Sequence, residues 1–448
     1  MSVVPALVFG TTGTNLVLSF IVAMAVMLLV SSCLRPMAQR MAAVSGLYSY
    51  TAKGLGPRAA ITAGWSAIFG YGLISMAGLL AVGTYGANIM ERLWGSAGDG
   101  TLVITLIILA AAALAGFFMI RGIHISAKVT LLVECVSILL LASLLTAYFV
   151  LARPHVDLAS LNPVNGNFHS LSLGVVVAVS AFVGFESSTT LGGEAQRPFI
   201  NIPRTIRWTP IVTGALYLLA VTGQDIALKD APGFIASSQT PLSDMFYFKT
   251  SALMAVMLDV GIAGSFFACV VASTNALART LFCMGREGVA PAIIGHTHQT
   301  FRTPWAAILT AMPVITGVPI VMVLYGVSPE KGLTDLFTLG AYGYLGAYVL
   351  ASASLPFFLR RIGEGTWASW ASGGITVGAV TFVVWNAVTL SAYEGNVQPA
   401  IYGALVTLSV LNAELLRWRF PARLNAVGIY DEPRESDIHS SAKSGRIP

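Results

Sequence analysis

The stretch that decides the fold runs from Leu171 to Pro203, LSLGVVVAVSAFVGFESSTTLGGEAQRPFINIP. Its first part, Ser172 to Phe185, is apolar enough for a helix in lipid, but Gly184, Glu186 and four hydroxyl residues interrupt it before a membrane crossing is complete. At ~1.5 Å per residue, Glu186 lies roughly 21 Å along a hydrocarbon core about 30 Å thick. Because a carboxylate is costly at that depth, intramembrane acids commonly face a cavity or a partner.

Glycine beside hydroxyl residues also indicates that the helix unwinds locally. Unwound backbone is tolerated at membrane depth only where it lines protein or water. The two half-helix ends then offer carbonyl groups to a cation and N–H groups to an anion. We therefore predict a broken helix that forms part of a binding site. The alternative is a kinked structural helix in which a neighbour satisfies Glu186.

The composition places the whole chain in a membrane. Of 448 residues, 56% are hydrophobic and 10% are charged, whereas about a quarter of the residues in soluble proteins are charged. We expect an all-α polytopic protein whose partner is the lipid bilayer. A net charge of +5 is too small to indicate nucleic acid. The four cysteines lie in apolar runs without CxxC spacing, which predicts no metal site. Nucleotide-binding and hydrolase motifs are absent, so we expect no cofactor and no enzyme.

Eleven full apolar spans follow from the hydropathy pattern. They cover approximately 15–34, 61–90, 101–120, 129–151, 172–195, 208–226, 251–283, 304–325, 333–359, 372–392 and 398–416. When alternate loops are assigned to opposite sides, twenty of the twenty-five Lys and Arg fall on one side. By the positive-inside rule that side is cytoplasmic, so we predict a multi-pass protein of the cell (plasma or inner) membrane with a cytoplasmic C-terminus.

The spans also show weak internal symmetry. Those that start near 208, 251, 304 and 333 match those near 15, 61, 101 and 129, which is typical of inverted repeats. We predict one transmembrane domain over 1–423, with repeats at approximately 1–151 and 172–359, extra helices at 372–418, and a disordered cytoplasmic tail at 424–448. The same offset predicts only the outer half of a first helix at the start of this sequence. The oligomeric state is not predicted.

Three motifs carry a family resemblance. They are SGLYSYTAKGLGP from Ser45, AFVGFESSTTLGGEAQRPFINIPRTI from Ala181, and STNALARTLFCMGREGVAP from Ser273. With them the chain resembles, across essentially its whole length, bacterial permeases of the amino acid, polyamine and organocation (APC) superfamily. The resemblance implies a leucine-transporter-type fold of 5+5 inverted repeats plus two C-terminal helices, with a substrate site at the breaks of helices one and six.

By position, the resemblance assigns the helix-six break to Phe182, Val183, Gly184, Phe185, Glu186 and Ser187, and the remnant of helix one to Val4 and Pro5. Phe182 is the expected aromatic gate, and Phe185 is the alternative. The chain departs from the family at Gly193-Glu194, where a pair of acids is expected, and at Arg197-Pro198, where Asn-Pro is expected. The short segment around Val4 would leave the carboxylate-binding break of helix one incomplete.

Four further side chains are candidates for the site or for ion coupling. Tyr71 and Ser75 are four residues apart on one helical face and could line the cavity, although core packing is the alternative. Glu134 lies in an apolar span, and in proton-coupled relatives a protonatable group near this place can substitute for sodium, so Glu134 and Glu186 are the proton-coupling candidates. Alternatively, Glu134 is solvated or paired with Lys128. Asp259 could bind a second substrate amine or be a solvated helix-end residue.

These observations favour a secondary carrier that moves an amino acid or related small organic amine inward, with protons as the coupling ion and alternating access between the two sides. The alternative is a membrane scaffold or sensor derived from such a permease, with an incomplete site.

Overall fold

The computed structural model describes residues 3–12, 16–95, 100–152, 168–229, 243–244, 247, 251–393 and 395–428. Within these residues the regular structure is entirely helical. The elements are α1 (Val3–Thr12), α2 (Leu16–Ala38), α3 (Leu47–Leu55), α4 (Pro57–Trp94), α5 (Gly100–Arg121), α6 (Ile123–Ala152), α7 (Phe168–Ser180), η4 (Phe185–Leu191), α8 (Pro198–Lys229), α11 (Ala252–Arg286), η5 (Ala292–Gly295), α12 (Trp305–Leu324), α13 (Pro329–Arg361), α14 (Trp367–Tyr393), α15 (Gln398–Arg419) and α16 (Pro421–Asn425).

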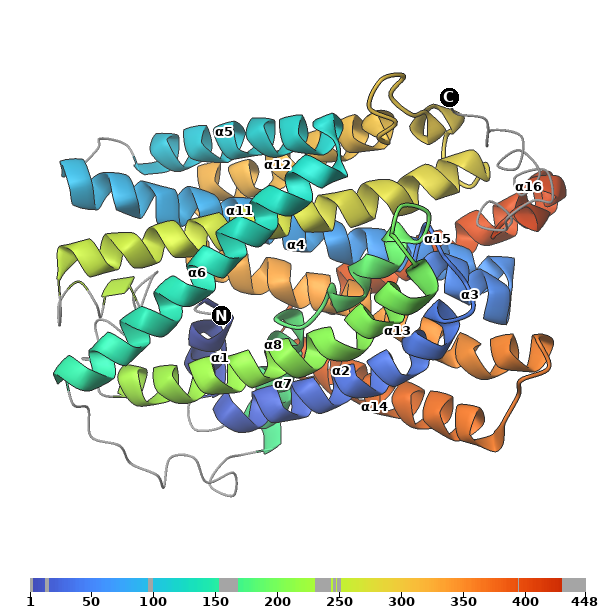
Figure 1. Ribbon diagram of the computed structural model, residues 1–448, viewed down its shortest axis with the longest axis horizontal. Coiled ribbons are helices and arrows are strands. Elements are labelled where there is room, and N and C mark those ends of the chain that lie inside the picture. The colour runs from blue at the N-terminus through green and yellow to red at the C-terminus, as the bar shows by residue number, and fades with distance from the viewer. Residues whose placement is uncertain are drawn as a thin grey trace, which may run out of the picture.

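The predicted all-α polytopic fold is confirmed. Each of the eleven predicted spans corresponds to a long helix, except that the span at 172–195 is divided between α7 and η4. In the part of the chain that the structure describes, nine helices are long and apolar enough to cross a membrane. Most of the long helices lie roughly along one axis, and α6, which is not one of these nine, crosses the bundle obliquely (Figure 1). The molecule is a multi-pass membrane protein.

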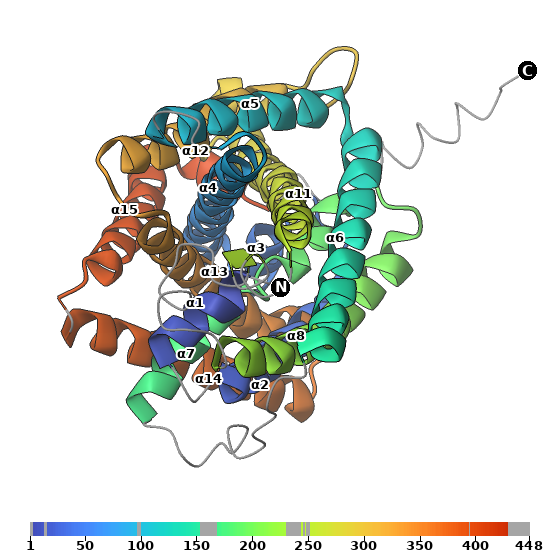
Figure 2. The same ribbon diagram turned by 90° about the vertical axis from the view of Figure 1, so that its left-hand side faces the viewer.

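The centre of the bundle is formed by α4, α11 and α13, with α5, α6, α12, α14 and α15 around them (Figure 2). Glycines allow the central helices to approach closely: a Cβ at Gly343 of α13 would lie 2.6 Å from the backbone nitrogen of Gly70 on α4. Ser66 fastens the same contact by donating to the Gly343 carbonyl at 2.6 Å. This trio therefore provides a closely packed core on which the site residues are mounted.

Large apolar side chains on the outer helices point away from the protein. Leu106 of α5, Leu139 of α6 and Leu408 of α15 are all more than half exposed. In water such a surface would be unfavourable, whereas lipid tails cover it at no cost. Contact with lipid therefore explains both these exposed apolar side chains and the apolar spans in the sequence.

The C-terminal segment stays packed beyond the predicted end of the domain at 423. Leu424 and Val427 are buried, and the Gly428 N–H donates to Glu287 at 2.8 Å. The described chain packs as far as Gly428, and the rest of the predicted tail, 429–448, lies outside the described residues.

Candidate functional site

The break between α7 and η4 is the starting point of the site. Helix α7 ends at Ser180, and turns at 181–184 lead into the 3-10 helix η4. Gly184 has φ 92°, in the left-handed region that glycine adopts without steric cost. The α-helical hydrogen bonds give way here to tighter i to i−3 bonds, as between the Ser187 N–H and the Gly184 carbonyl at 3.0 Å. The α-helix is thus interrupted at 181–184, where the sequence predicts a break.

The Glu186 carboxylate is fully buried at the first turn of η4. Tyr71 of α4 donates to its Oε1 at 2.9 Å, and Tyr348 of α13 donates to its Oε2. Two hydroxyl donors on two different helices satisfy the acid, which reduces the cost of its burial. The contacts also tie the broken helix to the central helices. Glu186 therefore lies at the break and is also satisfied by neighbouring side chains, as the alternative of a kinked structural helix required.

Aromatic rings enclose the break on both sides. Phe182 is buried, with its ring 5.2 Å from Tyr217 of α8 and 6.2 Å from Phe20 of α2. Phe185 packs 5.9 Å from Tyr348. Of the two gate candidates, Phe182 has contacts on two helices beside the break and Phe185 faces α13. Both rings are packed against neighbouring aromatic side chains in this conformation.

One buried tyrosine hydroxyl lies near the break. Tyr344 is buried on α13, and its ring meets that of Tyr71 in a T-shaped contact with the ring centroids 5.1 Å apart. Its hydroxyl lies near Gly184, where an added Cβ would be 3.6 Å away, and Ser273 lies close by. Among the described residues no hydrogen-bond partner meets the Tyr344 hydroxyl. A buried hydroxyl in this state is suited to a ligand or an ordered water.

A cavity of about 500 Å³ lies beside the break, between α1, α6, α7, α8 and α11. Its volume is that of a small-molecule site. Of the predicted site residues, Val4, Val183 and Glu134 line it together with Cys269 and Ser273. The rest of the predicted set, Pro5, Tyr71, Ser75, Phe182, Gly184, Phe185, Glu186 and Ser187, is not part of its wall. We call this space the main cavity.

Glu134 is half-buried on α6 and lines the main cavity. Ser265 of α11 donates to its Oε2 at 2.6 Å. The predicted alternative paired this acid with Lys128, but Lys128 is exposed, and the partner that the structure provides is the serine. The carboxylate is thus held at the cavity wall by a neutral donor.

Ser75 lies in the packed contact between α4 and α11. It is fully buried, donates to the Tyr71 carbonyl at 2.9 Å and accepts from Thr274 at 3.0 Å. The structure therefore places Ser75 in the core, in line with the packing alternative, and gives it no surface toward the main cavity.

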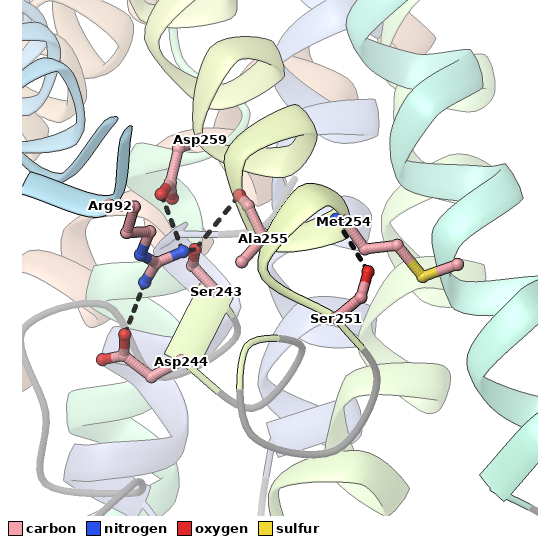
Figure 3. Close-up of polar contacts among 7 residues, drawn as sticks. All are labelled: Arg92, Ser243, Asp244, Ser251, Met254, Ala255 and Asp259. Carbon is pink, nitrogen blue, oxygen red and sulfur yellow. Dashed lines mark hydrogen bonds and ion pairs between the residues drawn. The ribbon is translucent and has the colours of Figure 1, made fainter. Parts of the chain in front are cut away.

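Asp259 is not a solvated helix-end residue, which was one of its two sequence interpretations. It is fully buried at the end of the bundle where α4 ends, and Arg92 lies 2.9 Å from it. Figure 3 shows the Arg92 guanidinium also bound to Asp244 at 2.5 Å and donating to Ser243 at 2.6 Å. The interpretation as a solvated helix-end residue was wrong, because a charge partner on α4 keeps Asp259 inside the protein. Binding of a second substrate amine stays a prediction.

The far end of η4 is fixed to α11 and to the loop before α3. Arg279 donates to the Thr190 carbonyl at 3.1 Å and pairs with Glu194 at 3.0 Å. The Gly192 N–H donates to the Ala43 carbonyl at 2.9 Å. At Gly193-Glu194 a pair of acids was expected from the resemblance, and the one acid present, Glu194, pairs with Arg279.

Sequence reasoning missed the tyrosines of α13. The segment from Gly340, GAYGYLGAYVL, carries Tyr344 and Tyr348 four residues apart and hence on one helical face. That spacing within a glycine-rich span was a usable signal. No comparable local pattern in the sequence indicated that Ser265 donates to Glu134 or that Cys269 lines the main cavity.

Comparison with known proteins decides the family. The family model described as amino acid permease matches residues 1–411. The chain belongs to the amino acid permease family. The predicted family resemblance is thereby confirmed.

Three relatives of this permease have informative names. They are an uncharacterized amino acid permease, YecA, of Bacillus subtilis (26% identical over 59% of this chain and 60% of that protein), the low-affinity putrescine importer PlaP of Escherichia coli (24%, over 66% and 65%), and the serine/threonine exchanger SteT of Bacillus subtilis (23%, over 71% and 69%). The match thus spans less than two thirds of the length of the first two. The three are named as a permease, an importer and an exchanger, and none as an enzyme.

Proposed function

We propose that this permease is a secondary active transporter that takes up an amino acid or a related small organic amine by alternating access, with protons as the coupling ion. It acts in the cell membrane with its C-terminus on the cytoplasmic side. The observation that carries the proposal is the break at Gly184 beside a cavity of about 500 Å³. A broken membrane helix next to a cavity is a binding device for charged small molecules.

The break and the cavity supply the groups that such a substrate needs. Backbone at 181–184 borders the cavity through Ala181 and Val183, and its carbonyl groups suit an ammonium ion. Val4 of α1 lines the same cavity. The buried Tyr344 hydroxyl adds one polar group near Gly184. The names of PlaP, a low-affinity putrescine importer, and SteT, a serine/threonine exchanger, support the same substrate class.

Glu134 is the proposed proton carrier. Its carboxylate lies at the main cavity and has a neutral hydroxyl donor, Ser265. An acid so placed can bind or release a proton without breaking an ion pair, which suits a carrier that must load and unload. Glu186 is the second candidate, but its two tyrosine donors suit a structural tie better than repeated proton exchange.

Uptake into proteoliposomes tests the proposal. A panel of radiolabelled amino acids and amines is presented with and without an inwardly directed proton gradient. We expect one substrate class to accumulate only with the gradient, and Glu134→Gln to lose this pH dependence while retaining exchange. Unaltered pH dependence in Glu134→Gln would refute its role. Absence of uptake across the panel would favour the scaffold or sensor alternative.

A further inference from the structure

A second cavity, of about 340 Å³, lies apart from the main cavity. Its walls come from α7, α13, α14 and the start of α15, and it shares no lining residue with the main cavity. Figure 2 views the bundle from the end at which α4 terminates and shows these four helices as neighbours. This second cavity is lined by both polar and apolar side chains.

The polar residues that line the second cavity include Asp335 and Gln398, together with Thr334, Thr338, Tyr342 and Asn396. The Gln398 amide nitrogen donates to Asp335 Oδ1 at 2.8 Å. Because a carboxylate only accepts, this bond fixes which way the amide points. The Gln398 oxygen is thereby turned away from Asp335. It is buried and has no hydrogen-bond partner in the described part of the chain.

Asp335 itself has no cationic partner among the described residues. The ion pairs found there involve other acids, and the half-buried Asp335 carboxylate receives only the Gln398 donor. Asp335 is the one charged residue among those that line this cavity, and the unpaired amide oxygen adds a second acceptor, while the hydroxyls of Thr334, Thr338 and Tyr342 can both donate and accept. Such a site repels anions and attracts a group with several N–H donors and a positive charge.

The facing wall is apolar. Leu173, Val176 and Val177 of α7 line the same cavity, and the two valines are buried. A ligand here therefore gains from a short hydrocarbon part on one side and a cationic part on the other. A hydrated inorganic ion would satisfy the acceptors but leave the apolar wall uncovered.

We propose that the second cavity is an accessory binding site for a small organic ammonium ion, with the ammonium group on Asp335 and Gln398 and its hydrocarbon on α7. Val177 lies one helical turn before the end of α7 at Ser180. A bound ion would thus contact both the half-helix that leads to the break and the helix that carries Tyr348. The site is distinct from that of the proposed transported substrate, and its occupancy does not depend on transport.

Calorimetric titration of the full chain in lipid nanodiscs tests this site, with n-butylammonium as the probe and butan-1-ol as its uncharged counterpart. We expect Asp335→Asn to weaken a butylammonium binding component by about tenfold or more, because a charge-assisted hydrogen bond is lost. Asp335→Glu keeps the charge and has room in the cavity, so it should retain that component. Glu330→Gln removes an exposed acid on the first turn of α13 and should change nothing.

Thermal unfolding of each variant establishes that it is folded. Butylammonium binding that is equal in wild type and Asp335→Asn would overturn the proposal, as would absence of binding or equally tight binding of butan-1-ol. Because the readout is binding, a failure of uptake in proteoliposomes leaves this result unaffected, and the two proposals fail separately.

Discussion

At the residue scale, Glu186 shows how a membrane helix can carry a buried acid. Its position at mid-span was predictable, because glycine, a carboxylate and hydroxyl residues interrupt an apolar run. Its partners were not predictable, because Tyr71 and Tyr348 lie 115 and 162 residues away along the chain. Local composition therefore identifies the break, while only the packing of α4 and α13 shows what satisfies the acid.

Replacing Glu186 by alanine should destabilise the protein. The change leaves the Tyr71 and Tyr348 hydroxyls buried without their acceptor, at a cost of about 1–3 kcal/mol for each unsatisfied group. The midpoint of thermal unfolding in detergent measures the effect, and Tyr348→Phe, which removes one donor, should lower it less. Glu330→Gln at an exposed position is the control. An alanine variant as stable as wild type would show that the tyrosines do not depend on Glu186.

Arg92 provides a second test at this scale. Arg92→Ala would leave Asp259 fully buried without its cation, and breaking one side of a buried ion pair costs about 3–5 kcal/mol. Asp259→Asn in the same background should recover part of this loss, since a neutral amide is cheaper to bury. A double-mutant cycle on thermal unfolding measures the coupling. Additive effects of the two substitutions would contradict the pairing.

At the element scale, η4 is the part of the broken helix that is fixed at both ends. Glu186 ties its start to α4 and α13, and Gly192 and Glu194 tie its end to the loop before α3 and to α11. The break itself was expected from the sequence, but the 3-10 geometry of η4 was not. That geometry depends on these tertiary contacts, because the hydroxyl-rich segment has weak helical preference.

Gly192→Ala tests this docking. A Cβ at Gly192 would lie 2.1 Å from the carbonyl oxygen of Ala43, which is backbone and cannot move aside cheaply. We expect η4 to shift from the loop, with loss of about 1–3 kcal/mol of stability and reduced uptake. Gly403→Ala in α15 is the matched control, because its Cβ would enter open space and alanine is the better helix residue. Equal behaviour of the two variants would show that the close approach is unimportant.

At the scale of the whole molecule, hydropathy alone predicted the order and extent of the long helices, because lipid selects for apolar length. The site could be predicted only in part. Val4, Val183 and Glu134 do meet at the main cavity, whereas Ser75 lies in the core. The sequence could not separate Ser75 from a residue that lines a cavity, because both can lie on the same helical face. Only its contact with Thr274 of α11 shows that Ser75 lies in the core.

The predicted orientation is a testable property of the whole chain. Twenty of the twenty-five Lys and Arg lie on the side assigned to the cytoplasm. Green fluorescent protein fused after the last residue should therefore fluoresce, while alkaline phosphatase fused there should be inactive. Fusions in the loop between α4 and α5 should give the opposite pattern. If green fluorescent protein fluoresced in that loop and alkaline phosphatase were active at the C-terminus, the predicted orientation would be contradicted.

The central claim is that substrate binds in the main cavity beside the break. Cys269 lines this cavity and is partly exposed, whereas Cys33 and Cys283 are buried, so a Cys135→Ser background leaves Cys269 as the accessible thiol among them. The decisive measurement is the rate at which a maleimide alkylates Cys269, with and without the substrate found by the uptake panel. We predict that substrate slows alkylation over the same concentrations that saturate uptake, while a non-transported analogue has no effect. Alkylation at an unchanged rate under saturating substrate would contradict the assignment of the site.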